Sequence, residues 1–220
     1  MPVLYCRRSA VDRVLKAAAG TDLASLERQI DRGPTPKSLV LANWKAQGET
    51  QVDRDERLVR NVVAVCEGQG PLADETVVLG AHYDHVGVQT VNNQKTVRNG
   101  ADDNASGVVV LLETARALQQ WKAQRKDKPC RRFVFIAFTA EESGLLGSAH
   151  YVRQPLLPLD KTVAMLNLDM VGRLRDDKLT VSGTESSPRL NELVDQCVPR
   201  QALKAAKPPA NFGGSDHLPF

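Results

Sequence analysis

No run of this sequence is long and apolar enough to cross a lipid bilayer. Its longest apolar runs, "GVVVLL" and "FVFIAF", are far shorter than the roughly 20 residues that a spanning helix needs. The N-terminal stretch "MPVLYCRRSAVDRV" also lacks the apolar core of a signal peptide. The sequence therefore predicts no transmembrane segment in this chain.

Cysteine and aromatic residues are scarce, and neither sign of charge dominates. The four cysteines form no C-x-x-C pair, which indicates free buried thiols rather than a disulfide scaffold. Aromatic residues make up 5% of the chain, the net charge is +3, and the basic residues are scattered. Together with the lack of a nucleic-acid-binding motif, these features argue against a nucleic-acid partner. The 42% hydrophobic and 25% charged residues are typical of a folded domain with a core.

The pattern of apolar residues divides the chain near residue 57. Residues 1–56 predict two helices at 9–19 and 22–31, followed by a strand at 38–47. Beyond residue 60, short apolar strands alternate with helices, which predicts an α/β sheet covered on both faces. The predicted strands are 61–68, 76–82, 131–138, 162–172 and 178–183, and the predicted helices are 106–121, 143–154 and 187–198.

Acidic and histidine residues gather where the predicted central strands end. In α/β folds, ligand sites form at the carboxyl edge of the sheet, so these side chains are candidates for one site. They are His82, Asp84 and His85 after one strand, Glu141 and Glu142 after another, Asp169 in a third, Asp102 and Asp103 before helix 106–121, and Asp216 and His217 in a glycine-rich loop.

Each of these residues, taken alone, has an ordinary structural explanation. Asp102 or Asp103 could cap the following helix, and Glu141 with Glu142 could favour a helix dipole. Taken together they are harder to explain, because adjacent acids at the end of a buried strand repel one another unless a positive charge lies among them. A pair of divalent cations would supply that charge.

Five side chains have the composition that a two-metal site requires. Such a site needs one imidazole and one terminal carboxylate for each ion, plus one carboxylate that both ions share. The chain offers these groups at His82, Asp103, Glu142, Asp169 and His217. Asp84 lies two residues from His82, where its carboxylate can accept the other N–H of that imidazole. Glu141 adjoins a ligand without being needed as one, which makes it the candidate general base.

The stretches "GAHYDHVG", "NGADDNASG", "FTAEESGLLGS", "NLDMVG" and "GGSDHLPF" resemble, in order, the motifs of the co-catalytic two-zinc exopeptidases. This family includes leucyl-type aminopeptidases, glutamate carboxypeptidase, glutaminyl cyclases and the non-enzymatic transferrin receptor. The resemblance covers roughly residues 60–220 and implies a three-layer α/β/α sandwich around a mostly parallel mixed sheet. It also implies a cis peptide bond between Asp103 and Asn104.

The same resemblance assigns the ligands. It implies that His82 and Asp169 bind one zinc, that Glu142 and His217 bind the other, and that Asp103 bridges them. His85 and His150 match no ligand position, so we interpret His85 as a residue at the rim of the site and His150 as an ordinary helix residue. Asp102 receives no role. Ligand type alone does not separate zinc from cobalt or manganese.

The implied activity is that of a zinc-dependent aminopeptidase. It would hydrolyse the N-terminal bond of a peptide with a free N-terminus, with a metal-bridged water as nucleophile and Glu141 as general base. Three alternatives stay open: a one-zinc glutaminyl cyclase, a carboxypeptidase whose basic pocket could use Arg173 and Arg175, and a non-catalytic binding domain. By analogy with relatives, the expected location is periplasmic or extracellular.

The ends of the chain suggest a piece of a longer protein. Residues 1–56 resemble the end of an inserted protease-associated domain that leads into the peptidase domain at 57–220. Because His217 lies three residues from the last residue, we expect this segment to fray and to bind its zinc weakly.

Overall fold

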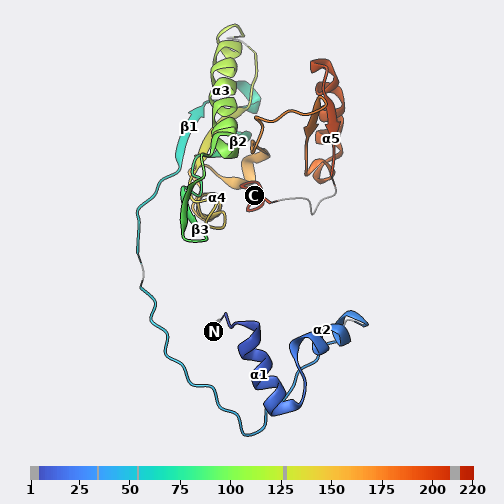
Figure 1. Cartoon of the computed structure of the whole chain (residues 1–220). Coiled ribbons are helices and arrows are strands. Elements are labelled where there is room, and N and C mark those ends of the chain that lie inside the picture. Colours follow the sequence, from blue (N-terminus) through green and yellow to red (C-terminus); the bar gives the residue numbers. More distant parts are fainter. Residues whose placement is uncertain (1–4, 34, 54, 126–127, 209–213) are drawn as a thin grey trace. The chain divides into compact units, whose positions relative to one another are not determined.

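The structure is a computed structural model that describes residues 5–33, 35–53, 55–125, 128–208 and 214–220 (Figure 1). The chain forms two compact units, Met1–Glu56 and Arg57–Phe220. That the first unit is the end of a protease-associated domain stays a prediction.

The first unit contains two helices, α1 (Arg8–Ala19) and α2 (Leu23–Asp31). Helix α1 ends at Gly20, which adopts the left-handed conformation that glycine accepts without strain. Helix α2 begins after Asp22, whose carboxylate accepts the backbone N–H of Ser25. Both predicted helices are confirmed. The predicted strand at 38–47 is wrong: its described residues form no strand, because no second strand pairs with them and Val40 stays exposed.

The second unit is built on a four-stranded sheet in the order β1-β5-β2-β6. Its strands are β1 (Val62–Cys66), β2 (Thr76–His82), β5 (Arg132–Phe138) and β6 (Thr162–Asn167). Strand β1 is antiparallel to β5, whereas β2 is parallel to both β5 and β6. The sheet is therefore mixed and mostly parallel, as predicted.

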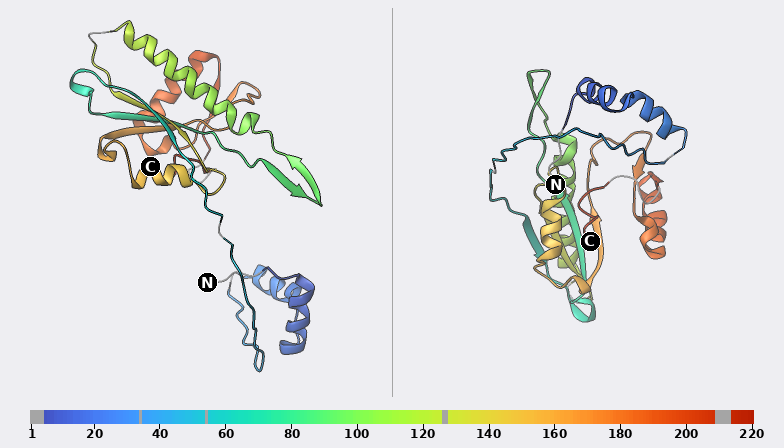
Figure 2. Two further views of the ribbon diagram at one scale, coloured as in Figure 1. Left: turned by 90° about the vertical axis from the view of Figure 1, so that its left-hand side faces the viewer. Right: turned by 90° about the horizontal axis from the view of Figure 1, so that it is seen from below.

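Helices cover both faces of this sheet (Figure 2). On one face Leu111 of α3 (Gly107–Ala123) packs with Leu79, Ala81 and Phe135. On the other face Tyr151 of α4 (Leu146–Arg153) joins a second core cluster, whose strand residues are Val78, Val134, Ile136 and Phe138. Successive residues of β2 and β5 thus point to opposite faces. This arrangement confirms the three-layer α/β/α sandwich.

Smaller elements complete the second unit. Strands β3 (Val88–Val91) and β4 (Gln94–Val97) form an antiparallel hairpin that the sequence analysis missed. Its turn contains Asn92 and Asn93, both at positive φ, so the Asn-Asn pair was an available signal. The remaining elements are β7 (Lys178–Thr180), α5 (Pro188–Cys197), β8 (Lys204–Ala206) and the short helices η1 (Gly70–Leu72), η2 (Ala101–Ser106), η3 (Leu159–Lys161), η4 (Thr184–Ser186) and η5 (Pro199–Gln201).

Several predicted elements are shorter than expected, among them the strand predicted at 178–183, of which only Lys178–Thr180 forms β7. Strand β6 ends at Asn167 rather than continuing to residue 172, and Met170 takes a positive φ that an extended strand excludes. Helix α4 begins at Leu146 rather than residue 143, after a turn in which Ala140, Gly144 and Leu145 all have positive φ. All four cysteines are free, but Cys6 and Cys197 are exposed rather than buried.

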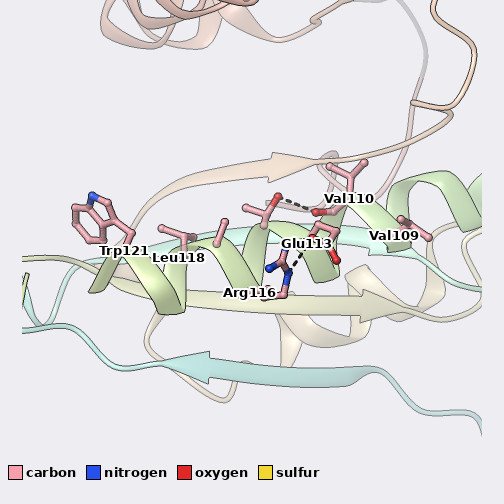
Figure 3. Close-up of a pocket in the computed structure, with 8 residues that line it drawn as sticks. Val109, Val110, Glu113, Arg116, Leu118 and Trp121 are labelled. Atoms are coloured by element: carbon pink, nitrogen blue, oxygen red, sulfur yellow. Dashed lines mark hydrogen bonds and ion pairs between the residues drawn. The ribbon is translucent and has the colours of Figure 1, made fainter. Parts of the chain in front are cut away.

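A groove of about 550 Å³ runs along the outward face of α3 (Figure 3). Val109, Val110, Leu118 and Trp121 give it an apolar wall, and Glu113 with Arg116 forms an ion pair beside them. None of the candidate site residues lines this groove. Among the described residues, no helix has the length and hydropathy needed to cross a membrane.

Candidate metal centre

The register of the parallel strands brings three of the candidate segments to one edge of the sheet. Residue His82 ends β2 directly beside Phe138, the last residue of β5. Glu141 and Glu142 follow Phe138 within four residues. On the other side of β2, Asn167 lies beside Gly80, so Asp169, two residues further along, reaches the level of His82.

Two groups of potential metal ligands form at this edge, and they share Asp103. In the first, which we call the His82 group, Nε2 of His82 lies 3.2 Å from Oδ1 of Asp103 and 3.6 Å from Oδ1 of Asp169. In the second, the His85 group, Nδ1 of His85 lies 2.6 Å from Oε1 of Glu142 and 3.8 Å from Oδ2 of Asp103. Each oxygen of the Asp103 carboxylate thus faces a different imidazole.

The backbone carbonyl of Asp84 orients the ring of His82. This carbonyl lies 3.0 Å from Nδ1, whereas the nearer carboxylate oxygen of Asp84 is 3.7 Å away. The contact therefore differs from the predicted one, which used the carboxylate. With Nδ1 donating to the carbonyl, Nε2 is the nitrogen that faces the acids.

The carboxylate of Asp84 instead holds the Glu141–Glu142 turn. It accepts the backbone N–H of Glu141 at 3.1 Å and that of Glu142 at 3.4 Å. One aspartate thereby connects the loop after β2 to the turn after β5. This contact places the candidate base next to the metal-ligand groups.

Asn104 fixes the loop that carries Asp103. Its side chain is buried, donates to the carbonyl of Leu168, and accepts the N–H groups of Gly107 and Met170. A Cβ at Gly107 would lie 2.4 Å from both Oδ1 of Asn104 and the carbonyl oxygen of Leu168, so only glycine fits there. The Asp103–Asn104 peptide bond is cis, as the resemblance implies.

Asp102, which the sequence left without a role, anchors the same loop from its other side. Its carboxylate lies 3.1 Å from Nε of Arg173 and accepts the N–H of Gly172. The charge of Arg173 is therefore balanced within the protein. Asp102 takes part in neither of the two metal-ligand groups.

The crowded acids and imidazoles change one another's pKa values. Burial alone would lower the pKa of His82, but the Asp169 carboxylate and the Asp84 carbonyl outweigh it and raise this pKa to about 9. Burial raises the pKa of Glu141 to about 7, and neighbouring carboxylates add to the rise against the opposing effect of His82. Burial also raises the pKa of Asp103, as do Glu142 and Asp169. Such crowding reflects negative charge that a cation would neutralise.

His217 belongs to neither metal-ligand group. Burial alone would raise the pKa of Asp169, but His82 and Ser215 outweigh it, with a smaller contribution from His217, and lower this pKa. The neighbouring Asp216 is fully buried, and burial raises its pKa. In this structure the imidazole beside Glu142 is that of His85. His150 is exposed on α4, as expected for an ordinary helix residue.

The segment that carries His217 is packed against the domain, contrary to the expected fraying. Ser215 accepts a hydrogen bond from the side chain of Asn167 at 2.8 Å. The ring of Phe220 stacks on Tyr151 and meets the edge of Phe138, with centroids 5.9 and 6.3 Å away. These contacts hold the segment against the face of the sheet that α4 covers.

The donor atoms of both groups fit divalent cations. Nε2 of His82 and Nδ1 of His85 are inaccessible to solvent and make no hydrogen bond, although carboxylate oxygens lie close to each. Buried polar atoms in proteins are nearly always hydrogen-bonded unless an ion or water satisfies them. Imidazole nitrogen and carboxylate oxygen are the donors that zinc takes.

A cavity of about 330 Å³ opens beside the two groups. His85 and Asp103 form part of its wall, together with Arg98, which follows β4, and with Met170 and Arg173, which follow β6. Its place next to the candidate metal ligands makes it a candidate for binding part of a substrate.

Comparison with known proteins agrees with the geometry. The model of peptidase family M28 matches residues 61–220. The "Probable leucine aminopeptidase" of Trichophyton verrucosum is 31% identical over 161 residues, which are 71% of this chain and 41% of that protein. Among solved structures, a zinc aminopeptidase from Bacillus subtilis is 32% identical with a TM-score of 0.55, over 73% of this chain and 36% of that one.

Glutaminyl cyclases are similar too. That of Porphyromonas gingivalis is 27% identical with a TM-score of 0.55, over 72% of this chain and 58% of that one. The chain thus spans less than half the length of the two aminopeptidases and somewhat more than half of the cyclase.

Proposed function

Because this chain belongs to peptidase family M28, we propose that it acts as a zinc-dependent aminopeptidase. The aminopeptidase relatives support this activity. The observation that carries the proposal is the carboxylate of Asp103, whose two oxygens face two separate imidazole–carboxylate groups. A carboxylate placed in this way is what a two-ion site requires.

The proposal assigns one ion to His82, Asp169 and Asp103. It assigns the other to Glu142 and Asp103, together with His217 as the resemblance implies. Zinc at such a centre supplies Lewis-acid polarisation of the scissile carbonyl. The protein's own contribution is to hold these side chains in place through Asn104 and the carbonyl of Asp84.

Glu141 is the proposed general base. It belongs to neither ligand group, and its backbone N–H is fixed by Asp84. In the proposed reaction its carboxylate removes a proton from the attacking water and returns it to the leaving amine. A pKa of about 7 suits a group that must both accept and donate a proton near neutral pH.

The acids of the centre also explain a preference for the end of a peptide. A free α-amine is positively charged at neutral pH, and the carboxylate of Glu141, which the proposal does not use as a ligand, would attract it. An internal peptide bond offers no such charge. The proposed substrate is therefore a peptide with a free N-terminus.

Glutaminyl cyclisation is the second candidate, because the cyclase structure is as similar by TM-score as the aminopeptidase structure. The carboxypeptidase alternative has less support, since Asp102 already balances Arg173 and Arg175 does not line the cavity. Parallel assays on a leucyl anilide, a glutaminyl peptide and a peptide with an acidic C-terminus separate the three. Two bound zinc ions per chain would favour the aminopeptidase.

The test of the mechanism is the substitution Glu141→Gln. We expect turnover of a leucyl anilide to fall by about 100- to 10,000-fold, with unchanged zinc content by mass spectrometry, because Glu141 is not a proposed ligand. Glu185→Gln removes an exposed carboxylate outside the centre and is the matched control. If Glu141→Gln retained a near-normal rate, its role as base would be wrong.

A further inference from the structure

Arg98 brings to the cavity beside the metal centre a positive charge without an acidic partner. It lines the cavity of about 330 Å³ that also borders His85 and Asp103. Its Nε donates to the side-chain oxygen of Gln89 at 3.0 Å, and among the described residues no carboxylate forms an ion pair with its guanidinium. The terminal NH2 groups of this guanidinium can therefore donate to a bound ligand.

The base of the β3–β4 hairpin holds Arg98 in place. Its backbone N–H donates to the carbonyl of Gly87 at 2.8 Å, next to the strand pair formed by Val88 and Val97. The hydrogen bond from Nε to Gln89 restricts the guanidinium as well. A planar guanidinium that is already held in this way loses little freedom when it binds a carboxylate.

The other arginine and the two aspartates of the cavity wall have partners of their own. Nε of Arg173 lies 3.1 Å from the carboxylate of Asp102, so these two charges balance each other. The carboxylate of Asp103 serves the two ions in the proposed function. Arg98 is therefore the charge that a molecule in the cavity would meet, and it favours an anionic group there.

The cavity also has an apolar part that suits the stem of an acidic side chain. Val97 is 64% exposed and Met170 is 53% exposed, and both line the cavity. The methylene groups of such a side chain would cover these two residues while its carboxylate binds Arg98. Because the same cavity borders Asp103, the acidic residue would lie next to the bond that is cleaved.

We propose that Arg98 is a specificity-determining residue that binds a carboxylate of the substrate. The inference rests on the proposed aminopeptidase function and adds a substrate class to it. The preferred peptide carries this carboxylate on one of the two residues that flank the cleaved bond. Its source is an acidic side chain or, in a dipeptide, the C-terminus, and the substrates of the test distinguish the two.

The test compares four short substrates. Leucyl-alanine amide carries no carboxylate, glutamyl-alanine amide and leucyl-glutamate α-amide carry one on the first or second residue, and the free dipeptide leucyl-alanine carries one at its C-terminus. In Arg98→Ala, kcat/KM for one of the three carboxylate substrates should fall about 10- to 100-fold relative to the neutral amide, as expected for a lost hydrogen bond to a charged group. That substrate identifies the source. Lys95→Ala removes an exposed cation of β4 that does not line the cavity and should leave the ratios unchanged.

A charge reversal guards against simple misfolding. For Arg98→Glu the preferred carboxylate is replaced by an amine, as lysine in place of glutamate or an aminoethyl amide in place of the C-terminus. Relative to the neutral amide, this cationic substrate should be cleaved about 10-fold faster than by the wild-type chain, a gain that misfolding cannot produce. Equal losses on all four substrates, unchanged ratios, or no such gain would each overturn the role of Arg98. A wild-type chain that hydrolyses none of the four would instead contradict the proposed function, and with it the inference that rests on it.

Discussion

The amide of Asn104 should contribute strongly to the stability of the second unit. Its three hydrogen bonds, to Leu168, Gly107 and Met170, connect the Asp103 loop to the segment that follows β6. The side chain is 2% exposed, so water cannot replace these bonds in Asn104→Ala. At about 1 kcal/mol for each bond, the variant should lose about 3 kcal/mol of unfolding free energy.

The two tryptophans allow this loss to be measured in the correct unit. Trp44 lies in the first unit and Trp121 on α3 in the second. In a Trp44→Phe background, the fluorescence of Trp121 during urea unfolding therefore reports on the second unit alone. Gln119→Ala removes an exposed amide from α3 and should change the free energy by less than about 0.5 kcal/mol.

The zinc affinity of Asn104→Ala provides an independent readout. If Asn104 orients Asp103, both ions should bind more weakly, by about 10- to 100-fold each. A stability loss below about 1 kcal/mol, with unchanged zinc affinity, would refute the reasoning, because the three bonds would then not hold the loop.

Two further substitutions separate the shared ligand from the residues around it. Asp103→Ala should reduce zinc content from two ions to none at micromolar metal, whereas Asp169→Ala should reduce it by one, as counted by mass spectrometry; equal losses would contradict a bridging role. Asp84→Asn replaces one of the two acceptor oxygens with an NH2 group, so the side chain can accept from only one of the N–H groups of Glu141 and Glu142. Turnover of a leucyl anilide should then fall by about 10- to 100-fold, and a normal rate would show that this contact does not position the base.

Much of the fold follows from local patterns in the sequence. Three predicted elements are confirmed, namely the apolar strands at 76–82 and 131–138 and the helix that begins near residue 107. The strands bury apolar side chains on both faces, and the helix buries them along one stripe. The strand predicted at 38–47 is wrong because an alternating pattern predicts only the capacity to pair, and none of the strands that the structure describes pairs with this segment. The hairpin at 88–97 was missed because its strands are exposed and carry little apolar signal.

The chemistry of the site was determined by the sequence, since only the residue types at the ends of the strands decide whether a cation can bind there. The pairing of those residues was decided by the tertiary structure. The register of β2 with β6 brings Asp169 level with His82, and the loop after β2 turns His85, not His217, toward Glu142. The same loop directs the carboxylate of Asp84 to the Glu141 backbone. Such contacts join residues far apart in the chain, and loop conformations of this kind depend on packing that no local pattern encodes.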